Sequence, residues 1–244
     1  MRWILPFLFA LLAACAPIYV QQSPGGSSPQ SAPRPETRTA AGPPTDARAQ
    51  AAARTFVEVT RTVEPLAEAE CRRVSPQQNC NFIIVVDDRP GQPPNAFQTV
   101  DRAGRPILAF NLALIASVEN ADELAFVMGH EASHHILGHL ARSQQNAAVG
   151  AVVFSGLAAM TGAGEEAVRS AERFGAAVGA RSYSKEFELE ADQLGTIITK
   201  RSGYDPINGA RFFTRIPDPG NRFLGTHPPN SARIDVVRRT AARL

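Results

Sequence analysis

The stretch that decides the fold is NADELAFVMGHEASHHILGHLAR, at residues 120–142. Asn120 is a good helix N-cap, and Glu123 follows three residues later, close to a capping box. Apolar residues then recur at helical spacing, so we predict a helix that begins at Asn120 and ends near Arg142. Within this helix, residues 130–134 form the motif HExxH.

The HExxH motif predicts a zinc site with one ion per chain. Residues four apart lie on one helix face a turn apart, so His130 and His134 can converge on a tetrahedral metal. Glu131 lies about 100° further round the helix, which keeps it off the metal and leaves it as a general base. The alternative is an amphipathic helix that exposes two histidines to solvent.

A catalytic zinc site needs a third protein ligand. Leu137 and Leu140 occupy the positions where a metzincin has Gly and His, so that solution is rejected. The run SKEFELEAD at residues 184–192 offers a carboxylate on a second helix instead. Glu188 and Asp192 share a face there, so Glu188 can bind zinc while Asp192 accepts a hydrogen bond from a ligating histidine. On its own, this acidic run would favour a solvated helix face.

These motifs resemble those of the gluzincin metallopeptidases of the CAAX prenyl protease and HtpX family, which includes periplasmic BepA-like and LoiP-like members. In that family, HExxH is followed by a serine, a basic residue and ExxxD, as at residues 184–192 here; Lys185 is a mild departure, because relatives often have arginine. Further matching motifs are Asn95-Ala96-Phe97, residues 202–206, residues 226–229 and Arg233-Ile234. The resemblance covers residues 52–244 and implies an α+β, mainly helical, zincin-type metalloprotease domain with a small sheet.

The resemblance also implies roles for residues outside the ligand set. Asn95, Ala96 and Phe97 are expected on or beside an edge strand with which an extended substrate could pair. His227 is expected near the zinc, as a switch or a transition-state donor, and a structural loop histidine is the alternative. His135 and His139 would form a pair on another helix face; a solvated or internally satisfied pair is favoured over a second metal site.

The remaining elements are predicted from local patterns. A helix capped by Thr45-Asp46 should run through Val63, where Pro65 interrupts or ends it. A strand is expected at residues 82–86, and residues 97–101 and 106–110 should form a hairpin. Residues 147–164 are apolar and rich in Ala and Gly, which predicts a buried or mobile hairpin beside the cleft, with a membrane-touching element as the alternative.

The N-terminal region predicts export and lipid attachment. Residues 1–14 have the positive start, apolar run and small residues of a signal peptide, and Leu12-Ala13-Ala14-Cys15 resembles a bacterial lipobox. An ordinary signal peptide with a chance cysteine is the alternative. Residues 15–50 are rich in Pro, Gly, Ser and Gln and are expected to be a disordered tether, followed by the protease domain at residues 51–244. By resemblance, Cys15 anchors the protein in the outer membrane, facing the periplasm of a Gram-negative bacterium.

Charge and cysteine content restrict the partners and the compartment. The formal net charge of +2 gives no electrostatic case for nucleic acid or a polybasic membrane surface. With Cys15 taken by lipid, Cys71 and Cys80 remain as an even pair in an oxidising compartment, which favours a disulfide over two free thiols.

The resulting functional hypothesis is a zinc-dependent endopeptidase in periplasmic or outer-membrane protein quality control. Its substrates would be proteins or peptides, and the family resemblance implies misfolded or stalled outer-membrane proteins among them. One alternative is a periplasmic chaperone or assembly factor with little proteolysis. Another is a zinc hydrolase that acts on cell-wall or lipid substrates.

Overall fold

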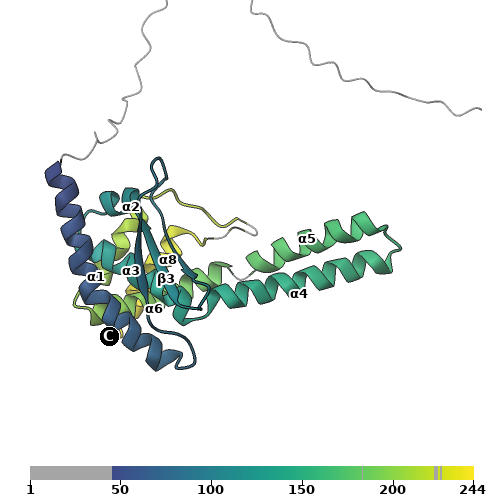
Figure 1. Ribbon diagram of the computed structural model, residues 1–244, viewed down its shortest axis with the longest axis horizontal. Coiled ribbons are helices and arrows are strands. Elements are labelled where there is room, and N and C mark those ends of the chain that lie inside the picture. The colour runs from purple at the N-terminus through teal and green to yellow at the C-terminus, as the bar shows by residue number, and fades with distance from the viewer. Residues whose placement is uncertain (1–45, 183, 223–224, 226) are drawn as a thin grey trace, which may run out of the picture. The chain divides into compact units, whose positions relative to one another are not determined.

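The computed structural model describes residues 46–182, 184–222, 225 and 227–244. The predicted signal peptide, Cys15 and most of the predicted tether lie outside these residues. In chain order the described elements are α1 (Asp46–Val74), β1 (Ile83–Asp87), β2 (Ala96–Val100), β3 (Pro106–Asn111), α2 (Leu112–Ser117), α3 (Ala121–Ile136), α4 (His139–Met160), α5 (Glu165–Arg181), α6 (Ser184–Arg201), α7 (Pro206–Gly209), the 3-10 helix η1 (Ala210–Thr214) and α8 (Asn230–Ala241) (Figure 1). This mainly helical α+β architecture with a small sheet agrees with the prediction.

Helix α1 does not end at Pro65, as the sequence led us to expect, but continues to Val74. Val63 and Ala67 lie on either side of the proline and are both buried in the core. Proline inside a helix costs about 3 kcal/mol, chiefly through one lost hydrogen bond and a clash with the preceding turn. The buried face that continues past the proline offsets this cost, so tertiary packing overrides the local preference.

The sheet is mixed and has the strand order β1-β3-β2. The central strand β3 pairs in parallel with β1 and antiparallel with β2, so the predicted hairpin is present. Among the residues that the structure describes, β2 has no strand on its outer side. An edge of this kind leaves backbone N–H and C=O groups free to pair with another chain.

Helix α3 runs through the centre of the core. Its start is as predicted: the Asn120 side chain accepts a hydrogen bond from the Glu123 backbone N–H, at 3.0 Å. Its end differs, because α3 stops at Ile136 instead of near Arg142. Gly138 has φ 67°, a left-handed conformation that commonly terminates helices, and a separate helix, α4, begins at His139.

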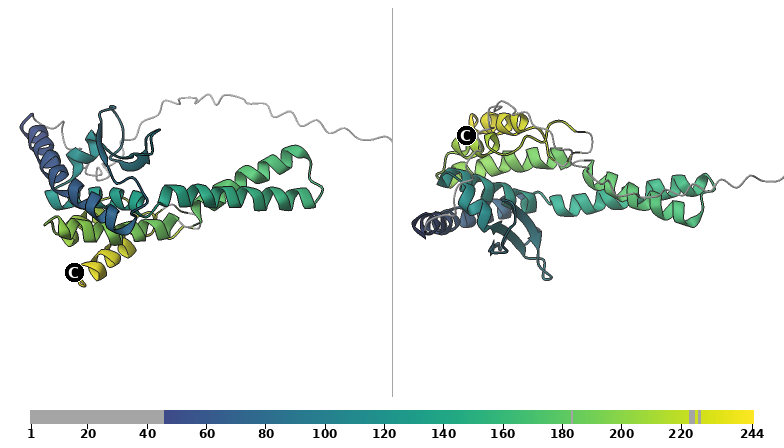
Figure 2. Two further views of the ribbon diagram at one scale, coloured as in Figure 1. Left: turned by 60° about the horizontal axis from the view of Figure 1, so that its bottom comes forward. Right: turned by 90° about the horizontal axis from the view of Figure 1, so that it is seen from above.

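Helices α4 and α5 pack side by side as an arm, residues 139–181, that projects from the rest of the domain (Figures 1 and 2). The glycines of the arm allow this close packing, because a Cβ on Gly150 or Gly179 would overlap a backbone carbonyl of the opposite helix. Residues 147–164, which were expected to form a hairpin by themselves, are instead the end of α4 and the turn before α5, because the helix is longer than predicted. Val152 and Met160 are 71% and 86% exposed, so this segment is not buried. Within the described part of the chain, none of the helices combines the length and hydrophobicity that a bilayer span requires.

A disulfide joins Cys71 near the end of α1 to Cys80 in the loop before β1. The two cysteines are nine residues apart in sequence, and both are buried. The bond therefore closes a short loop against the core and fixes the chain between α1 and the sheet.

Replacing both Cys71 and Cys80 with serine is expected to lower the free energy of unfolding by about 2–3 kcal/mol, because a loop of about ten residues is no longer constrained in the unfolded chain. Urea unfolding of the variant and of oxidised wild type measures the difference. Dithiothreitol should reproduce the shift in wild type and leave the variant unchanged. An identical unfolding midpoint for oxidised and reduced wild type would refute this account.

Candidate metal centre and cleft

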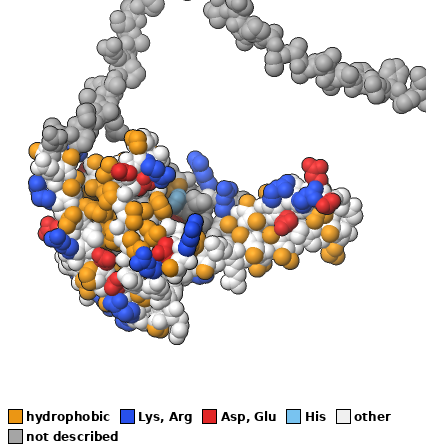
Figure 3. Space-filling model, viewed as in Figure 1, with side chains coloured by type: hydrophobic (Ala, Val, Ile, Leu, Met, Phe, Trp, Pro, Cys, Tyr) orange, Lys and Arg blue, Asp and Glu red, His pale blue; other side chains and the backbone are white. Residues whose placement is uncertain are grey.

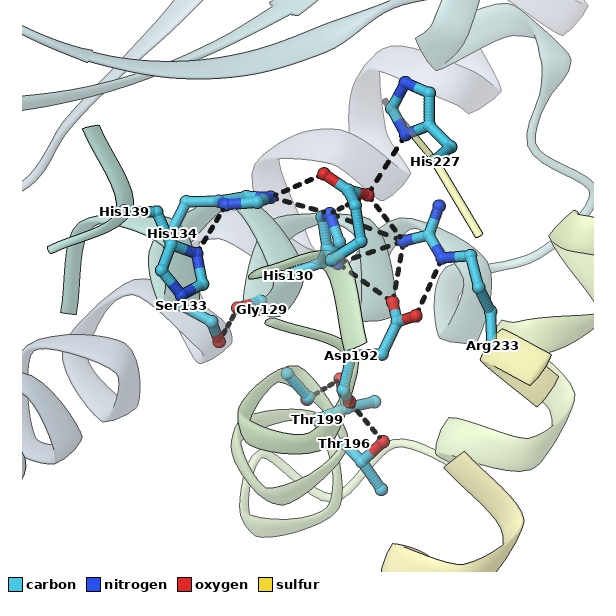
Figure 4. A network of polar contacts seen from close by, with 12 residues as sticks. Gly129, His130, Ser133, His134, His139, Asp192, Thr196, Thr199, His227 and Arg233 are labelled. Atoms are coloured by element: carbon cyan, nitrogen blue, oxygen red, sulfur yellow. Dashed lines mark hydrogen bonds and ion pairs between the residues drawn. The ribbon is translucent and has the colours of Figure 1, made fainter. Parts of the chain in front are cut away.

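Side chains from α3 and α6 converge at one point of the domain. The Nε2 atoms of His130 and His134 are 3.0 Å apart. The Glu188 carboxylate faces both rings, with Oε2 at 3.5 Å from His130 Nε2 and Oε1 at 3.4 Å from His134 Nε2. Figure 4 shows how the rings of His130 and His134 lie beside each other. These three residues each present one ligand atom within 4.8 Å of the others, so a His-His-Glu metal site is present.

Two glycines allow α6 to approach α3 closely enough for this convergence. A Cβ on Gly195 would lie 2.9 Å from the His130 backbone nitrogen, closer than real Cβ contacts. Gly129 lies at the same close approach, because a Cβ added there would be 3.0 Å from the Gly195 carbonyl oxygen. The backbones of α3 and α6 therefore touch directly at these glycines. Gly129 directly precedes His130, and Gly195 lies seven residues after Glu188 on α6.

The donor set and its electrostatics fit a divalent cation. Ligands of a tetrahedral zinc at about 2.0–2.1 Å lie roughly 3.3 Å from one another, close to the separations between these atoms. Burial disfavours the charged form of Glu188, but hydrogen bonds from His130, His134 and His227 outweigh it and hold its pKa well below the usual range. For His130, burial is outweighed by Asp192 and Glu188, which raise its pKa to about 10. The pocket thus favours a positive charge among its buried carboxylates.

A second layer of polar contacts supports His130. Its Nδ1 lies 3.0 Å from Asp192 Oδ1, which is the orienting contact predicted from the sequence. Arg233 of α8 donates Nε to Asp192 Oδ2 and Nη2 to Oδ1, both at 2.7 Å. Its guanidinium also lies 4.0 Å over the centre of the Phe213 ring. The sequence offered Arg233 only as part of a family motif and gave no indication of this role.

Arg233→Met is expected to lower the free energy of unfolding by about 3–5 kcal/mol, because it leaves the Asp192 carboxylate buried without its cationic partner. Equilibrium urea unfolding measures the loss. Arg238→Met removes an exposed arginine from the same helix and serves as the matched control. Adding Asp192→Asn to the first variant should restore part of the stability; no recovery in the double variant would contradict this explanation.

A cleft of about 850 Å³ opens onto the ligands, with Glu131 in its lining beside His130 and His134. Histidine atoms are visible in a hollow beside the base of the arm (Figure 3). The predicted substrate strand, Asn95-Ala96-Phe97, forms part of one wall. Residues 212, 213 and 215–217 contribute to the lining as well, so the cleft extends from the free edge of β2 to the segment that follows η1.

His227 also lines the cleft, and its side chain is 54% exposed. Its Nδ1 atom lies 3.3 Å from Glu188 Oε2, so the loop before α8 contacts a predicted metal ligand directly. The structure therefore brings this histidine to the site that the family resemblance implies. The contact alone is compatible with either role considered for it.

The expected pairing of His135 with His139 is wrong, because α3 ends before Gly138. His135 Nε2 lies 2.8 Å from the Asn79 carbonyl, and its ring meets Phe82 edge-on. His139 turns instead toward the ligand His134, with their Nδ1 atoms 2.8 Å apart. Glycine at residue 138 was the sequence feature that could have predicted this break.

The comparison with protein families agrees with this geometry. The model of peptidase family M48 matches residues 53–241, which is most of the chain. The chain belongs to peptidase family M48. This membership confirms the resemblance drawn from HExxH and ExxxD, and with it the expectation of a metallopeptidase-family domain with a His-His-Glu site.

Curated relatives of this M48 chain are themselves proteases. The beta-barrel assembly-enhancing protease of Escherichia coli (strain K12) is 32% identical over 158 residues, which cover 54% of this chain and 30% of that protein. Its Yersinia pestis counterpart is 32% identical over 145 residues, with the same coverage. The mitochondrial metalloendopeptidase OMA1 of Saccharomyces cerevisiae is 28% identical over 163 residues, covering 63% of this chain and 45% of that protein. This chain spans less than half the length of these relatives.

Proposed function

We propose that the protein is a zinc-dependent endopeptidase that cleaves peptide bonds in proteins of the periplasm or outer membrane. The observation that carries the proposal is the convergence of His130, His134 and Glu188 at the floor of a cleft that Glu131 also lines. Two imidazoles and one carboxylate with an open side are the ligand set of catalytic rather than structural zinc sites. The metalloprotease relatives support the same reaction class.

In this mechanism Glu131 is the general base and then the general acid. A zinc ion bound at the site would supply Lewis acidity toward a water molecule and the scissile carbonyl. Glu131 takes a proton from the attacking water and delivers it to the departing amine. Asp192, held by Arg233, keeps His130 in the tautomer that presents Nε2 to the ligand site.

The free edge of β2 supports an extended polypeptide as substrate. Backbone pairing along the outer edge of β2, beside Ala96 and Phe97, would recognise main-chain groups and would tolerate many side chains. Asn95 would flank this edge without pairing through its backbone, because its N–H and C=O groups are already bonded to Asn111. Only segments that can become extended and fit the cleft could pair in this way, so unfolded or stalled proteins are better substrates than compact ones. Fluorescently labelled casein against a folded globular protein tests this preference.

The two roles proposed for His227 differ in the sign of their effect. As a transition-state donor, it would be needed for turnover, so His227→Ala would lower kcat. As a switch that closes the site through Glu188, it would hold activity down, so the same substitution would raise kcat. Steady-state cleavage of a fluorogenic peptide by this variant separates the two roles.

Lipid attachment at Cys15 and an outer-membrane location belong to the proposal as well. They are supported by the lipobox-like sequence and by relatives whose name refers to beta-barrel assembly. Metabolic labelling with a radioactive fatty acid should mark the wild type and not Cys15→Ser. Labelling of both chains, or of neither, would reject an anchor at this cysteine.

The decisive test of the enzymatic proposal is zinc-dependent cleavage by purified protein. Casein cleavage should disappear with a chelator and return when Zn²⁺ is restored. Digestion of peptidoglycan without cleavage of casein would favour the cell-wall hydrolase instead. Zinc-replete protein that cleaves neither substrate would overturn the endopeptidase function.

A further inference from the structure

His139 is a buried histidine that directly contacts a predicted metal ligand. Its Nδ1 lies 2.8 Å from Nδ1 of His134, and the two rings meet at 72° with their centroids 5.0 Å apart (Figure 4). Only 4% of the His139 side chain is exposed. His139 follows the left-handed turn at Gly138, which places its ring against the outer edge of the His134 ring.

The position of His134 fixes the direction of the hydrogen bond between the two rings. His134 Nε2 faces His130 and Glu188, so it must keep its lone pair for a metal ion. The proton of the neutral ring is therefore on Nδ1, and this N–H donates to His139 Nδ1. His139 must then carry its own proton on Nε2.

The next group accepts that second proton. Glu190 Oε2 lies 3.1 Å from His139 Nε2, and Arg142 Nη1 donates to the same carboxylate oxygen at 2.6 Å. The hydrogen bonds thus run in one direction, from His134 to His139 to Glu190. This series of hydrogen bonds begins at a predicted metal ligand, His134, and ends at the partly exposed carboxylate of Glu190.

Packing holds the His139 ring in the orientation that these two hydrogen bonds require. The ring stacks on Phe187, with centroids 4.6 Å apart and planes 9° from parallel. The Arg142 guanidinium also lies over the Phe187 ring, at 4.2 Å from its centre. Phe187 directly precedes Glu188, so one turn of α6 supplies a ligand, the stacking ring and the carboxylate of Glu190.

We propose that His139 is a positioning residue for the metal centre, which fixes the tautomer and the ring orientation of His134 with the support of Glu190. Asp192 has the corresponding place beside His130, so each ligating histidine has its own orienting partner. His139 is not itself a ligand in this arrangement, because its Nδ1 is engaged by the far nitrogen of His134. The inference rests on the proposed function in one respect, that the site binds zinc.

The test measures zinc affinity and metal geometry in the full chain. Competition with a chromophoric chelator gives the zinc Kd, and the visible absorption of the Co²⁺-substituted protein reports the geometry of the site. His139→Phe keeps a flat ring for stacking and removes the acceptor, so the zinc Kd should rise by about 10–100-fold and the Co²⁺ bands should shift. Circular dichroism confirms that the variant is folded.

Conservative variants distinguish orientation from packing. His139→Asn can place an amide oxygen near the former Nδ1 and should recover much of the affinity, whereas His139→Gln places its amide nearer the former Nε2 and should not. If His139→Phe does not fold, the difference in zinc Kd between His139→Asn and His139→Gln decides whether His139 orients His134. Glu186→Gln, on an exposed residue of α6, is the matched control and should leave both readouts unchanged.

Each other outcome counts against a specific claim. An unchanged Kd and Co²⁺ spectrum in folded His139→Phe would overturn the positioning role while wild-type zinc binding stands. Equal losses in the Asn and Gln variants would also overturn it, because a purely structural role predicts no rescue. Wild-type protein that binds no zinc would overturn the proposed function together with this inference.

Discussion

Glu131→Gln is expected to lower peptide-bond cleavage by about 10²–10⁴-fold and to leave one zinc bound per chain. Glutamine has the same shape as glutamate but cannot take a proton from water. The residue lines the cleft without being one of the three groups that converge on the metal position, so the substitution removes the base and keeps the ligands. Casein hydrolysis gives the rate, and a colorimetric zinc assay on the same sample gives the metal content.

The matched control is Glu172→Gln, which makes the same chemical change at an exposed residue of the arm. It should retain wild-type activity. Cleavage by Glu131→Gln at more than a tenth of the wild-type rate would remove Glu131 from the mechanism. In cells, full rescue of a deletion phenotype by this variant would favour the chaperone alternative over the protease.

Glu188→Ala is expected to weaken zinc binding by more than about 100-fold, beyond the 10–100-fold typical of residues that only orient a ligand. The variant loses one of three protein ligands, and it leaves two histidines without the carboxylate that both of them face. Activity at ordinary zinc concentrations should fall to background. The zinc Kd from chelator competition and the stoichiometry after dialysis measure the effect.

Two neighbouring carboxylates make this assignment specific. Glu186→Gln should keep wild-type zinc affinity, because Glu186 is exposed on the same helix. Glu190 contacts His139 and Arg142, so its removal should cost less than the removal of Glu188. If Glu188→Ala kept full zinc while Glu190→Ala lost it, the third ligand would have been assigned to the wrong residue.

The parts of the site that the sequence predicted are those with a fixed local spacing. HExxH and ExxxD each place two side chains on one helix face, and this relation depends only on helix geometry. The prediction that the two helices meet was made on chemical grounds, because a metal bound by two histidines needs another protein ligand. Both arguments hold without knowledge of the rest of the fold.

The residues that the sequence did not assign depend on tertiary contacts or on one backbone break. Arg233 lies 41 residues after Asp192, and no periodic pattern links them. His139 has the spacing of a partner for His135, and only the left-handed turn at Gly138 directs it to His134. The predicted helix end at Pro65 was wrong for a related reason, because a buried helix face can outweigh a local helix breaker.

The contact between Gly129 and Gly195 sets a limit on how this enzyme could be made more stable. On helix propensity alone, Gly195→Ala would be a standard stabilising substitution, with a gain of about 1 kcal/mol. Here the added methyl group would meet the His130 backbone and push α6, with Glu188, away from the histidines. Engineering for thermal resistance should therefore leave Gly129 and Gly195 unchanged. Any increase in melting temperature from a substitution there would be accompanied by separation of Glu188 from the two histidines.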